Sequence, residues 1–381
     1  MAKIMLDYHM PGDIRTWGTY VPEEAIERAT EVLNGGWLNT GKNEKLLREI
    51  FCDKFNSRFC VAVNNGTAAL RTSYAMLGIG HGDEVISTPY TFIATNTSIL
   101  EQGAIPVFAD VRYEDLNVTA ETIERKITNK TKAIVVVHYA GNPVDLDEIR
   151  SLAMSYNLPL IEDSAHALGS RYKDKYIGET GELVTFSLQS IKIVTSGDGG
   201  FIATDNEEYY EKLKKRVWYG VDRDKKQSNL FYDPLPSEID VIGFKYNMND
   251  VVASLGIAGI NNIDIPLKRR NTIGNLYRRE LNSLKKVKLL EYYVDRTPNY
   301  QIFPIHVNDR EVFAKFMWDS GIQIVVNNRR NDLYKIFGGV RDDLFTTALV
   351  DSDTILLPIH YDLSDIDVEK IINKVLEYDK L

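Results

Sequence analysis

The stretch TKAIVVVHYAGNPVDLDEIRSLAMSYNLPLIEDSAHALG, residues 131–169, indicates the fold class of this chain. Its first part, 131–141, is an almost continuous apolar run, which predicts a strand buried on both faces. Residues 144–157 have helical periodicity, and a second apolar strand begins at residue 158. A strand, a helix and a strand in this order are typical of an α/β protein with a parallel sheet.

The alternation extends in both directions from this stretch. On the N-terminal side we predict strands at 58–65, 83–89 and 105–111, with helices at 22–33, 67–77, 91–103 and 120–127. On the C-terminal side the run ELVTF, 182–186, predicts a further strand. In a parallel sheet covered on both faces, ligands bind beyond the carboxyl ends of the strands. The residues that follow each predicted strand are therefore the candidates for a functional site.

The pattern changes near residue 250. We predict helices at 248–263, 264–284, 310–319 and 364–379, and strands at 300–307 and 321–326. A chain of 381 residues is long enough for two domains of about 100–200 residues each. The prediction is a large domain over 1–250 and a smaller α/β domain over 251–381.

Charge and composition argue against several classes of partner. A net charge of −9 disfavours binding to nucleic acid or to an anionic membrane surface, because both need a basic face. No stretch approaches the ~20 apolar residues of a membrane span, and the N-terminus lacks the apolar centre of a signal peptide. Cys52 and Cys60 have no metal-ligand spacing, so we expect buried thiols and no metal site. The expected location is the cytoplasm.

A turn after the strand at 58–65 has the composition of an anion site. Asn65, Gly66 and Thr67 lead directly into the predicted helix. Backbone N–H groups and the positive dipole end at a helix start favour a phosphate, and the Thr67 hydroxyl adds a donor. A plain N-cap explains Thr67 equally well.

Two more candidate groups follow neighbouring strands. Asp163 ends an apolar strand, where a carboxylate needs a cationic or hydrogen-bonded partner. It is either half of a structural salt bridge or the counter-ion of a protonated ring nitrogen. His166 is a capping residue or a second ligand contact. Phe92, which follows the strand at 83–89, either packs in the core or stacks on a flat ring.

The loop FSLQSIKIVTSGDGGF, 186–201, adds a candidate nucleophile. Ser187 follows the strand at 182–186 and can donate to an anion, while glycines at 197, 199 and 200 permit tight backbone paths. Lys192 lies between them. If it meets a bound aldehyde, burial and nearby positive charge would lower its pKa and activate the amine. Each feature alone is weak, and the evidence is their common position at one edge of one sheet.

Seven motifs, in family order, resemble the DegT/DnrJ/EryC1/StrS sugar aminotransferases, which are fold-type I enzymes that use pyridoxal phosphate (PLP). The resemblance covers nearly the whole chain and rests on GGWLNTGKN (35–43), NNGTAAL (64–70), HGDEVISTPYTFIAT (81–95), HYAGNPVDLD (138–147), IEDSAHALGS (161–170), FSLQSIKIVTSGDGG (186–200) and GFKYNMNDVVASLG (243–256). It implies a large domain with a mostly parallel seven-stranded sheet flanked by helices, and a smaller C-terminal α/β domain.

For the cofactor ring, the resemblance implies that Lys192 binds the aldehyde covalently and that Asp163 pairs with the pyridine nitrogen. Phe92 would stack on the ring, and His166 would lie near its oxygen side. Gln189 would also contact the cofactor; it stands three residues before the lysine, where the family often has histidine. The family's sugar dehydratases replace the lysine itself with histidine, so Lys192 favours transamination.

For the phosphate, the resemblance implies contacts from Gly66, Thr67 and Ser187. In the family an asparagine of a partner subunit also reaches the phosphate, and Asn247 is the candidate here. The active sites would then be shared across a homodimer. The WLNTG loop with Thr40 would contact substrate in the neighbouring site.

The implied activity is transfer of an amino group from an amino acid, L-glutamate by family analogy, to a keto-sugar. The expected acceptor is a nucleotide-linked 3- or 4-keto-6-deoxysugar, used in amino-sugar biosynthesis for a surface glycan or a natural product. Arg329 and Arg330, in NNRRNDLY (327–334), are candidates for binding its diphosphate. A solvated charged loop explains these two arginines at least as well.

Other activities stay open. Gln189 occurs in both nucleotide-sugar and aminocyclitol aminotransferases, so a keto-inositol is an alternative acceptor. A PLP lyase or desulfurase is disfavoured, because neither cysteine lies in a mobile, electropositive loop by pattern. A non-catalytic PLP-binding regulator usually carries a DNA-binding module. A chain of charge −9 whose motifs begin near residue 35 has no room for one.

Overall fold

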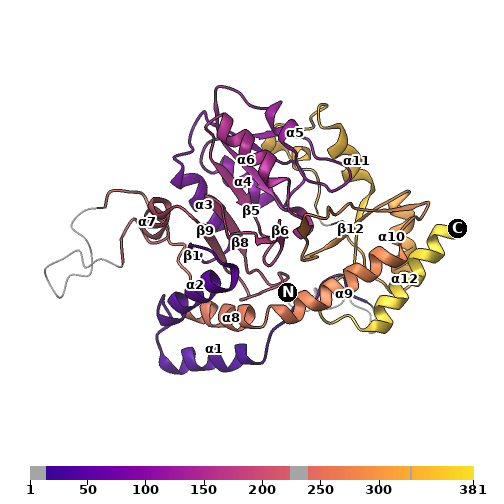
Figure 1. The fold of residues 1–381 in the computed structure, drawn as a ribbon, viewed down its shortest axis with the longest axis horizontal. Coiled ribbons are helices and arrows are strands. Elements are labelled where there is room, and N and C mark those ends of the chain that lie inside the picture. Colours follow the sequence, from indigo (N-terminus) through magenta and orange to yellow (C-terminus); the bar gives the residue numbers. More distant parts are fainter. Residues whose placement is uncertain (1–13, 224–238, 327) are drawn as a thin grey trace.

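The computed structural model describes residues 14–223, 239–326 and 328–381 of the chain. Figure 1 shows a large sheet covered by helices and, at the other end of the molecule, a smaller group of strands and helices. This is the α/β class that the sequence predicts. Within the described ranges, no helix is long and apolar enough to cross a membrane.

The large sheet, within the described residues, has seven strands in the order β1-β9-β8-β5-β4-β2-β3. Their bounds are β1 (Phe59–Val63), β2 (Glu84–Ser87), β3 (Ile105–Phe108), β4 (Thr131–Val137), β5 (Leu160–Asp163), β8 (Leu183–Ser187) and β9 (Gly200–Thr204). Neighbours from β8 through β5, β4 and β2 to β3 run parallel. Strand β9 runs antiparallel to both β1 and β8. The sheet is therefore mostly parallel, as predicted, and its strands other than β9 end at one edge.

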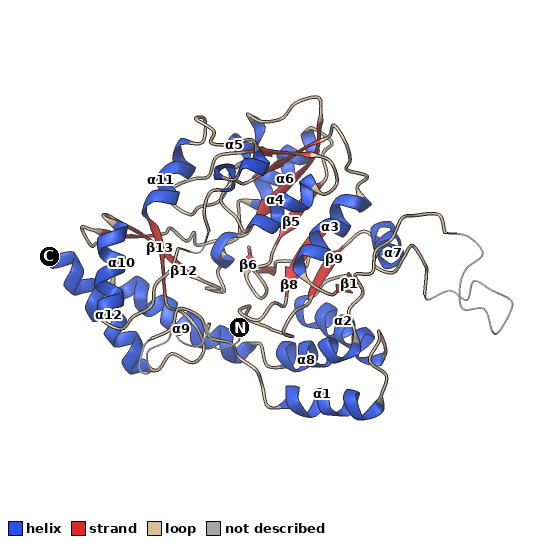
Figure 2. Ribbon diagram, turned by 180° about the vertical axis from the view of Figure 1, so that it is seen from behind, coloured by secondary structure: helices blue, strands red, loops and turns tan. Residues whose placement is uncertain are grey.

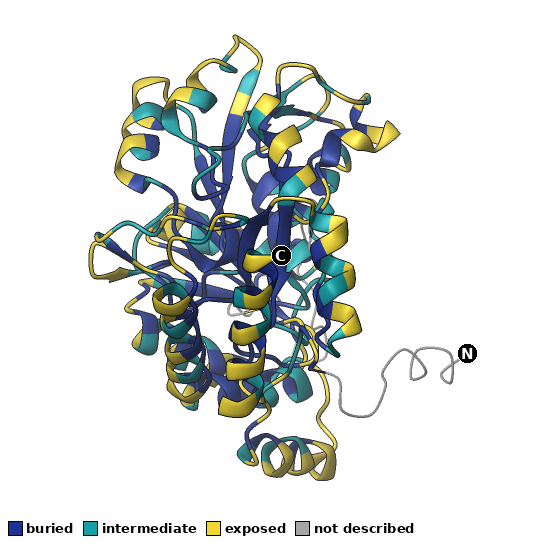
Figure 3. Ribbon diagram, turned by 90° about the vertical axis from the view of Figure 1, so that its right-hand side faces the viewer, coloured by how far each residue is buried: buried dark blue, intermediate teal, exposed yellow. Residues whose placement is uncertain are grey.

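Apolar residues fill both faces of this sheet. In β4, Ile134 and Val136 belong to one core and Ala133 and Val135 to another, because successive side chains of a strand point to opposite faces. Both faces therefore need cover, as the apolar run at 131–141 predicts. The helices of this part are α1 (Glu24–Gly35), α2 (Lys42–Phe55), α3 (Gly66–Met76), α4 (Ile93–Leu100), α5 (Ala120–Glu124), α6 (Leu146–Ser155), α7 (Glu207–Arg216) and α8 (Asp250–Asn261). Figure 3 shows the buried strands at the centre and exposed outer faces on the helices.

Helix α8 packs against α1 and α2, at the bottom of Figure 1. Its buried residues Ala253, Ile257 and Ile260 belong to the core of the large sheet. The next helix, α9 (Asp264–Glu280), carries Ile273 and Tyr277 into the core of the smaller part. The predicted boundary between residues 250 and 251 stays a prediction, and the packing of α8 does not favour it.

The smaller part is built on a three-stranded antiparallel sheet (Figure 2). Its strands are β10 (Val287–Leu289), β12 (Phe303–Val307) and β13 (Thr354–Leu357), and its other helices are α10 (Arg310–Asp319), α11 (Phe345–Asp353) and α12 (Asp365–Lys380). A short sheet of β6 (Arg171–Tyr172), β7 (Lys175–Tyr176) and β11 (Arg296–Thr297) joins this part to the large one, because β11 pairs with β6. Single 3₁₀ turns are η1 (Tyr139–Gly141), η2 (Asn331–Leu333) and η3 (Lys335–Phe337).

The predicted strand at 321–326 is wrong. Ile322 forms one isolated bridge with Ile14, and Val325 forms another with Leu356. The segment changes partner within three residues, so no ladder develops along it. Apolar composition alone indicated a strand here, whereas pairing depends on which chain lies alongside.

Candidate active site

A cavity of about 600 Å³ lies at the edge where the parallel strands end. Residues that end or follow β1, β2, β4, β5 and β8 line it, which is the position that ligands take in such sheets. The residues predicted from the sequence that line it are Gly66, Thr67, Phe92, Asp163, His166, Ser187, Gln189 and Lys192. The fold thus brings together side chains from segments that are far apart in the chain.

Asp163 is a buried carboxylate, 5% exposed, at the end of β5. Its Oδ2 accepts a hydrogen bond from Thr95 Oγ1 at 2.7 Å, and its Oδ1 accepts one from the Ala165 N–H at 3.2 Å. Burial raises the pKa of this carboxyl, while these two hydrogen bonds and the charge of Lys192 lower it. Among the described residues no cation lies within ion-pair distance of Asp163, so the structural salt bridge considered from the sequence is not seen.

Lys192 lies in the loop between β8 and β9 and lines the same cavity. The base of this loop is closed where the Leu188 N–H donates to the Gly199 carbonyl at 2.8 Å. Burial lowers the pKa of the Lys192 amine to about 8; the Asp163 carboxylate opposes this shift and the Arg270 guanidinium adds to it. At pH 7 a larger share of this amine is neutral and nucleophilic than for an exposed lysine.

The start of α3 forms a cradle beside β8, and we call Gly66, Thr67 and Ser187 the cradle. Asn65 caps α3, because its Oδ1 accepts a hydrogen bond from the Ala68 N–H at 2.7 Å. The N-cap interpretation of Thr67 is therefore wrong, and Thr67 lies in the first helical turn. A Cβ on Gly66 would lie 2.9 Å from the Ser187 Cβ, so a side chain there would close the cradle. Unpaired N–H groups and the dipole at a helix start favour an anion.

His166 and Phe92 both line the cavity, His166 with an unpaired ring nitrogen and Phe92 with an exposed ring. His166 Nδ1 is buried and has no hydrogen-bond partner among the described residues. Burial and the charge of Lys192 hold the pKa of His166 well below its ordinary value, so its ring is neutral at pH 7. Phe92 is 64% exposed just before α4, which excludes the core-packing interpretation within this chain.

Thr40 and Asn247 contact each other but do not line this cavity. Asn247 Nδ2 donates to Thr40 Oγ1 at 2.6 Å, and Thr40 Oγ1 donates to the Met248 carbonyl at 2.7 Å. The family resemblance implies that both residues belong to the site of a partner subunit. That assignment stays a prediction.

The two arginines predicted to bind substrate differ in exposure. Arg330 is 6% exposed, and its guanidinium donates to both carboxylate oxygens of Asp332, at 2.7 and 2.6 Å. Arg329 pairs with Asp351 at 3.1 Å, but its side chain is 55% exposed. The geometry therefore favours Arg329 over Arg330 as a substrate contact.

Thr95 and Asn328 are two polar residues at this site that the sequence-based set does not contain. Thr95 holds Asp163, as described above. Asn328 is 6% exposed and lines the cavity, and its Nδ2 has no hydrogen-bond partner among the described residues. In the sequence, the one indication of either residue is that it lies close to a predicted site residue. Thr95 lies three residues after Phe92, and Asn328 lies beside Arg329.

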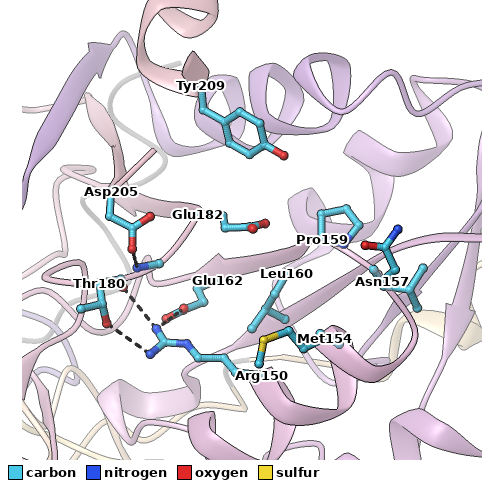
Figure 4. Close-up of a pocket in the computed structure, with 13 residues that line it drawn as sticks. Arg150, Met154, Asn157, Pro159, Leu160, Glu162, Thr180, Glu182, Asp205 and Tyr209 are labelled. Carbon is cyan, nitrogen blue, oxygen red and sulfur yellow. Dashed lines mark hydrogen bonds and ion pairs between the residues drawn. The ribbon is translucent and has the colours of Figure 1, made fainter. Parts of the chain in front are cut away.

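A second cavity, of about 580 Å³, lies at the opposite edge of the sheet, where β5 and β8 begin (Figure 4). Among the described residues that line it, Arg150 is the basic one, and it donates to Glu162 at 2.8 Å and to the Thr180 hydroxyl at 3.2 Å. Its charge is thus already paired, and no lysine or histidine is found among those lining residues. The cavity that contains Lys192 is therefore the candidate active site.

Comparison with known proteins identifies the family of the chain. The model of the DegT/DnrJ/EryC1/StrS aminotransferase family matches residues 20–376. The uncharacterised protein MJ1066 of Methanocaldococcus jannaschii is 36% identical over 372 residues, which cover 93% of this chain and 95% of that protein. The sugar aminotransferase CalS13 of Micromonospora echinospora superposes with a TM-score of 0.90 at 28% identity, covering 96% of this chain and 99% of that one.

A second solved structure is the PMP form of Spr1654 from Streptococcus pneumoniae, a protein assigned as a sugar aminotransferase. It superposes with a TM-score of 0.90 at 25% identity, covering 97% of this chain and 99% of that one. The match to the family model and the likeness of these folds extend over nearly the whole chain. The chain therefore belongs to the DegT/DnrJ/EryC1/StrS family and is a PLP-dependent aminotransferase of the fold-type I class.

Proposed function

We propose that this protein moves an amino group from an amino acid to a keto-sugar, with PLP attached to Lys192. One observation carries the proposal: an amine of lowered pKa, a buried carboxylate and a helix start meet in one cavity. These three groups match the aldehyde, the ring nitrogen and the phosphate of a single PLP molecule.

The chemistry of the other cavity residues also fits PLP. Asp163 would face the protonated ring nitrogen, and its hydrogen bond from Thr95 fixes its orientation. The unpaired Nδ1 of the neutral His166 would meet the ring oxygen. Phe92 would cover one face of the ring, and the cradle would hold the phosphate through N–H and hydroxyl donors.

The residues would share the work of transamination as follows. When bound, PLP supplies a cationic ring that draws electrons from the amino-bearing carbon of the substrate. Asp163 would keep the ring nitrogen protonated, since a buried carboxylate favours a cation beside it. Lys192, once displaced by the amine of the donor, would accept the proton from that substrate carbon and deliver it to the cofactor carbon that had carried the aldehyde. With the keto-sugar bound it would move a proton in the opposite direction, from that cofactor carbon to the acceptor carbon. Its lowered pKa favours the neutral form that accepts a proton.

The proposed donor is L-glutamate, and the proposed acceptor is a nucleotide-linked 3- or 4-keto-6-deoxysugar. The sugar class is supported by the likeness to CalS13, and use of an aminated cofactor is supported by the PMP form of Spr1654. Asn328 offers an unpaired amide to a sugar oxygen. The exposed guanidinium of Arg329 would face a phosphate of the nucleotide.

We further propose a homodimer with shared sites. Thr40 and Asn247 lie outside the cavity of their own chain and carry polar groups on neighbouring loops. A second copy would place this pair beside the cradle of the first. Mixing a Lys192→Ala chain with an Asn247→Ala chain is the direct check on such sharing. If the sites are shared, one site of a mixed dimer lacks both groups and the other keeps both, so mixing should restore activity.

The half-reaction with the donor tests the function. Purified protein mixed with L-glutamate, with no keto-sugar present, is expected to release one 2-oxoglutarate per active site and to retain pyridoxamine phosphate. Absorbance of the lysine-bound cofactor should disappear at the same rate. Absence of any keto acid with glutamate, glutamine, aspartate or alanine would contradict the assignment as a transaminase.

The acceptor is identified by the second half-reaction. The aminated protein is mixed with UDP-, dTDP- and GDP-linked keto-sugars and with a keto-inositol, and return of the lysine-bound absorbance is followed. We expect return with a nucleotide-linked keto-sugar. Return with the keto-inositol alone would identify the aminocyclitol alternative instead.

Gly66→Ala is expected to raise the Kd for PLP at least about tenfold, or about 1.4 kcal/mol, because the new Cβ would meet Ser187 inside the cradle. Titration of cofactor-depleted protein with PLP, followed by absorbance, measures this effect. Gly80→Ala is the matched control, since a Cβ at Gly80 has no heavy atom within 4 Å. Equal affinity in the two variants would remove the cradle from the phosphate site.

A further inference from the structure

Gln301, just before β12, reaches the loop that carries Lys192. Its Oε1 accepts a hydrogen bond from the Ile193 N–H at 3.1 Å, and its Nε2 donates to the Ile191 carbonyl at 2.9 Å. One side-chain amide thus holds the main chain on both sides of Lys192. Gln301 is 2% exposed, so water does not compete for these bonds.

The loop has no sheet partner at this point. Residues 191 and 193 lie beyond the end of β8 and before the start of β9, so neither strand pairs with their main-chain groups. Ile193 is 3% exposed, and a buried N–H without a partner is destabilising. Gln301 therefore supplies the donor and the acceptor that a neighbouring strand supplies elsewhere.

Gln301 is itself held by residues of the smaller part. Arg270, on α9, donates from Nη1 to the carbonyls of Tyr300, Gln301 and Ile359, at 3.0, 2.9 and 2.8 Å. Asn299 Oδ1 accepts a hydrogen bond from the Gln301 N–H at 2.9 Å. Because its own backbone is fixed on both sides, the Gln301 side chain can hold the lysine loop at a fixed distance from β12.

Arg270 adds an electrostatic effect to this mechanical one. It is 3% exposed, and its charge lowers the pKa of Lys192. The segment 299–301 thus contacts both a buried cation and the main chain on either side of Lys192. A conformational change in the smaller part that moved this segment would also move the main chain beside Lys192, through the two hydrogen bonds of the Gln301 side chain.

We propose that Gln301 is a positioning residue that fixes the direction in which Lys192 points into the cavity. The inference rests on the proposed function, because it matters for catalysis only if Lys192 carries the cofactor and moves the proton. A misplacement of about 1 Å at a reacting group can cost roughly 10²-fold in rate. Loosening the loop should therefore slow proton transfer and leave donor binding nearly unchanged.

Gln301→Leu removes both hydrogen bonds and keeps much of the side-chain volume. In the full-length holoprotein we expect kcat for the glutamate half-reaction to fall about 10²-fold while KM for glutamate stays within about threefold. Hydrogen exchange of the peptide over 189–196 should become at least roughly tenfold faster, and exchange in α3 should not change. A merely structural role would alter the melting temperature and move neither quantity.

Two further variants keep the test decisive. Gln301→Glu retains the shape and the acceptor for the Ile193 N–H but loses the donor to the Ile191 carbonyl, so a smaller fall in kcat of about tenfold is expected. Gln323→Leu removes another buried glutamine, 6% exposed, which does not line the cavity. It should leave kcat within about twofold of the wild type and the exchange of 189–196 unchanged.

Borohydride reduction of the wild-type holoprotein, followed by peptide mass spectrometry, identifies the lysine that carries PLP. If the mass lies on another lysine, the proposed role of Lys192 and this inference both fail. If it lies on Lys192 but both Gln301 variants keep the wild-type kcat, the inference alone is overturned. A fall in kcat without faster exchange at 189–196 would also overturn it.

Discussion

Lys192→Ala is expected to lower kcat by at least about 10³-fold and to abolish covalent attachment of PLP. Lys192 is the only lysine among the described residues that line the cavity, so no second lysine amine there can take over either task. Turnover with glutamate and a keto-sugar measures the first effect. The mass of the borohydride-reduced protein measures the second.

Lys212→Ala is a suitable control for this variant. Lys212 is exposed on α7 and pairs with Glu208 at 2.6 Å, as surface i,i+4 pairs do. Its loss should change kcat by less than about twofold, because exposed pairs of this kind contribute little. Lys192→Arg keeps the charge but offers a guanidinium that cannot form the covalent link, and should be as inactive as the alanine variant. A Lys192→Ala protein with a tenth of wild-type turnover would defeat the assignment.

Asp163→Asn is expected to lower kcat by about 10²–10³-fold, the range seen when one preorganised electrostatic group is removed from an active site. The carboxylate stabilises a positive charge on the ring nitrogen, and a neutral amide of the same shape does not. The new amide oxygen can keep the bond from the Ala165 N–H, and the Thr95 hydroxyl can turn to accept from the amide N–H, so packing should change little. The loss should appear in kcat, with PLP affinity changed much less.

The matched control for this variant is Asp110→Asn. Asp110 also follows a strand of the large sheet, but it accepts hydrogen bonds from Thr346 and Thr347 at the start of α11 and does not line the cavity. It should lose stability and keep kcat within about twofold. The absorbance of bound PLP should change with pH in the Asp163 variant, as the ring nitrogen loses its proton, and stay as in the wild type in the control. Equal spectra and equal kcat in both variants would remove Asp163 from its proposed role.

The parts of the fold that could be predicted are those that depend on local pattern. The buried strand at 131–141 and the helix at 144–157 correspond to β4 and α6, because continuous apolar residues and helical periodicity are properties of a single segment. The reversed direction of β9 could not be predicted in this way. The loop after β8 reverses the chain, so that β9 pairs antiparallel with β8. A parallel neighbour would have needed a longer crossover connection.

The residues of the candidate site also differ in whether local pattern could predict them. Asp163, Lys192 and the cradle follow predicted strands, and the edge rule places them together from strand ends alone. Asn328 and Gln301 act through contacts with segments far away in the chain, and nothing in their own neighbourhood indicates those contacts. The pairing of Arg330 with Asp332 could not be foreseen either, because two adjacent arginines in a sequence do not show which carboxylates lie beside them in the fold.

The pairing of β1 with β9 has a consequence for biogenesis. Residues 59–63 lie against 200–204, and Gly66 packs against Ser187, so the cradle joins two segments separated by more than about 100 residues. A nascent polypeptide has no cradle until its early strand meets one synthesised much later, and such long-range contacts form slowly. Vitamin B6 would therefore be captured only by molecules that have completed the large sheet, which makes loading a marker of maturation.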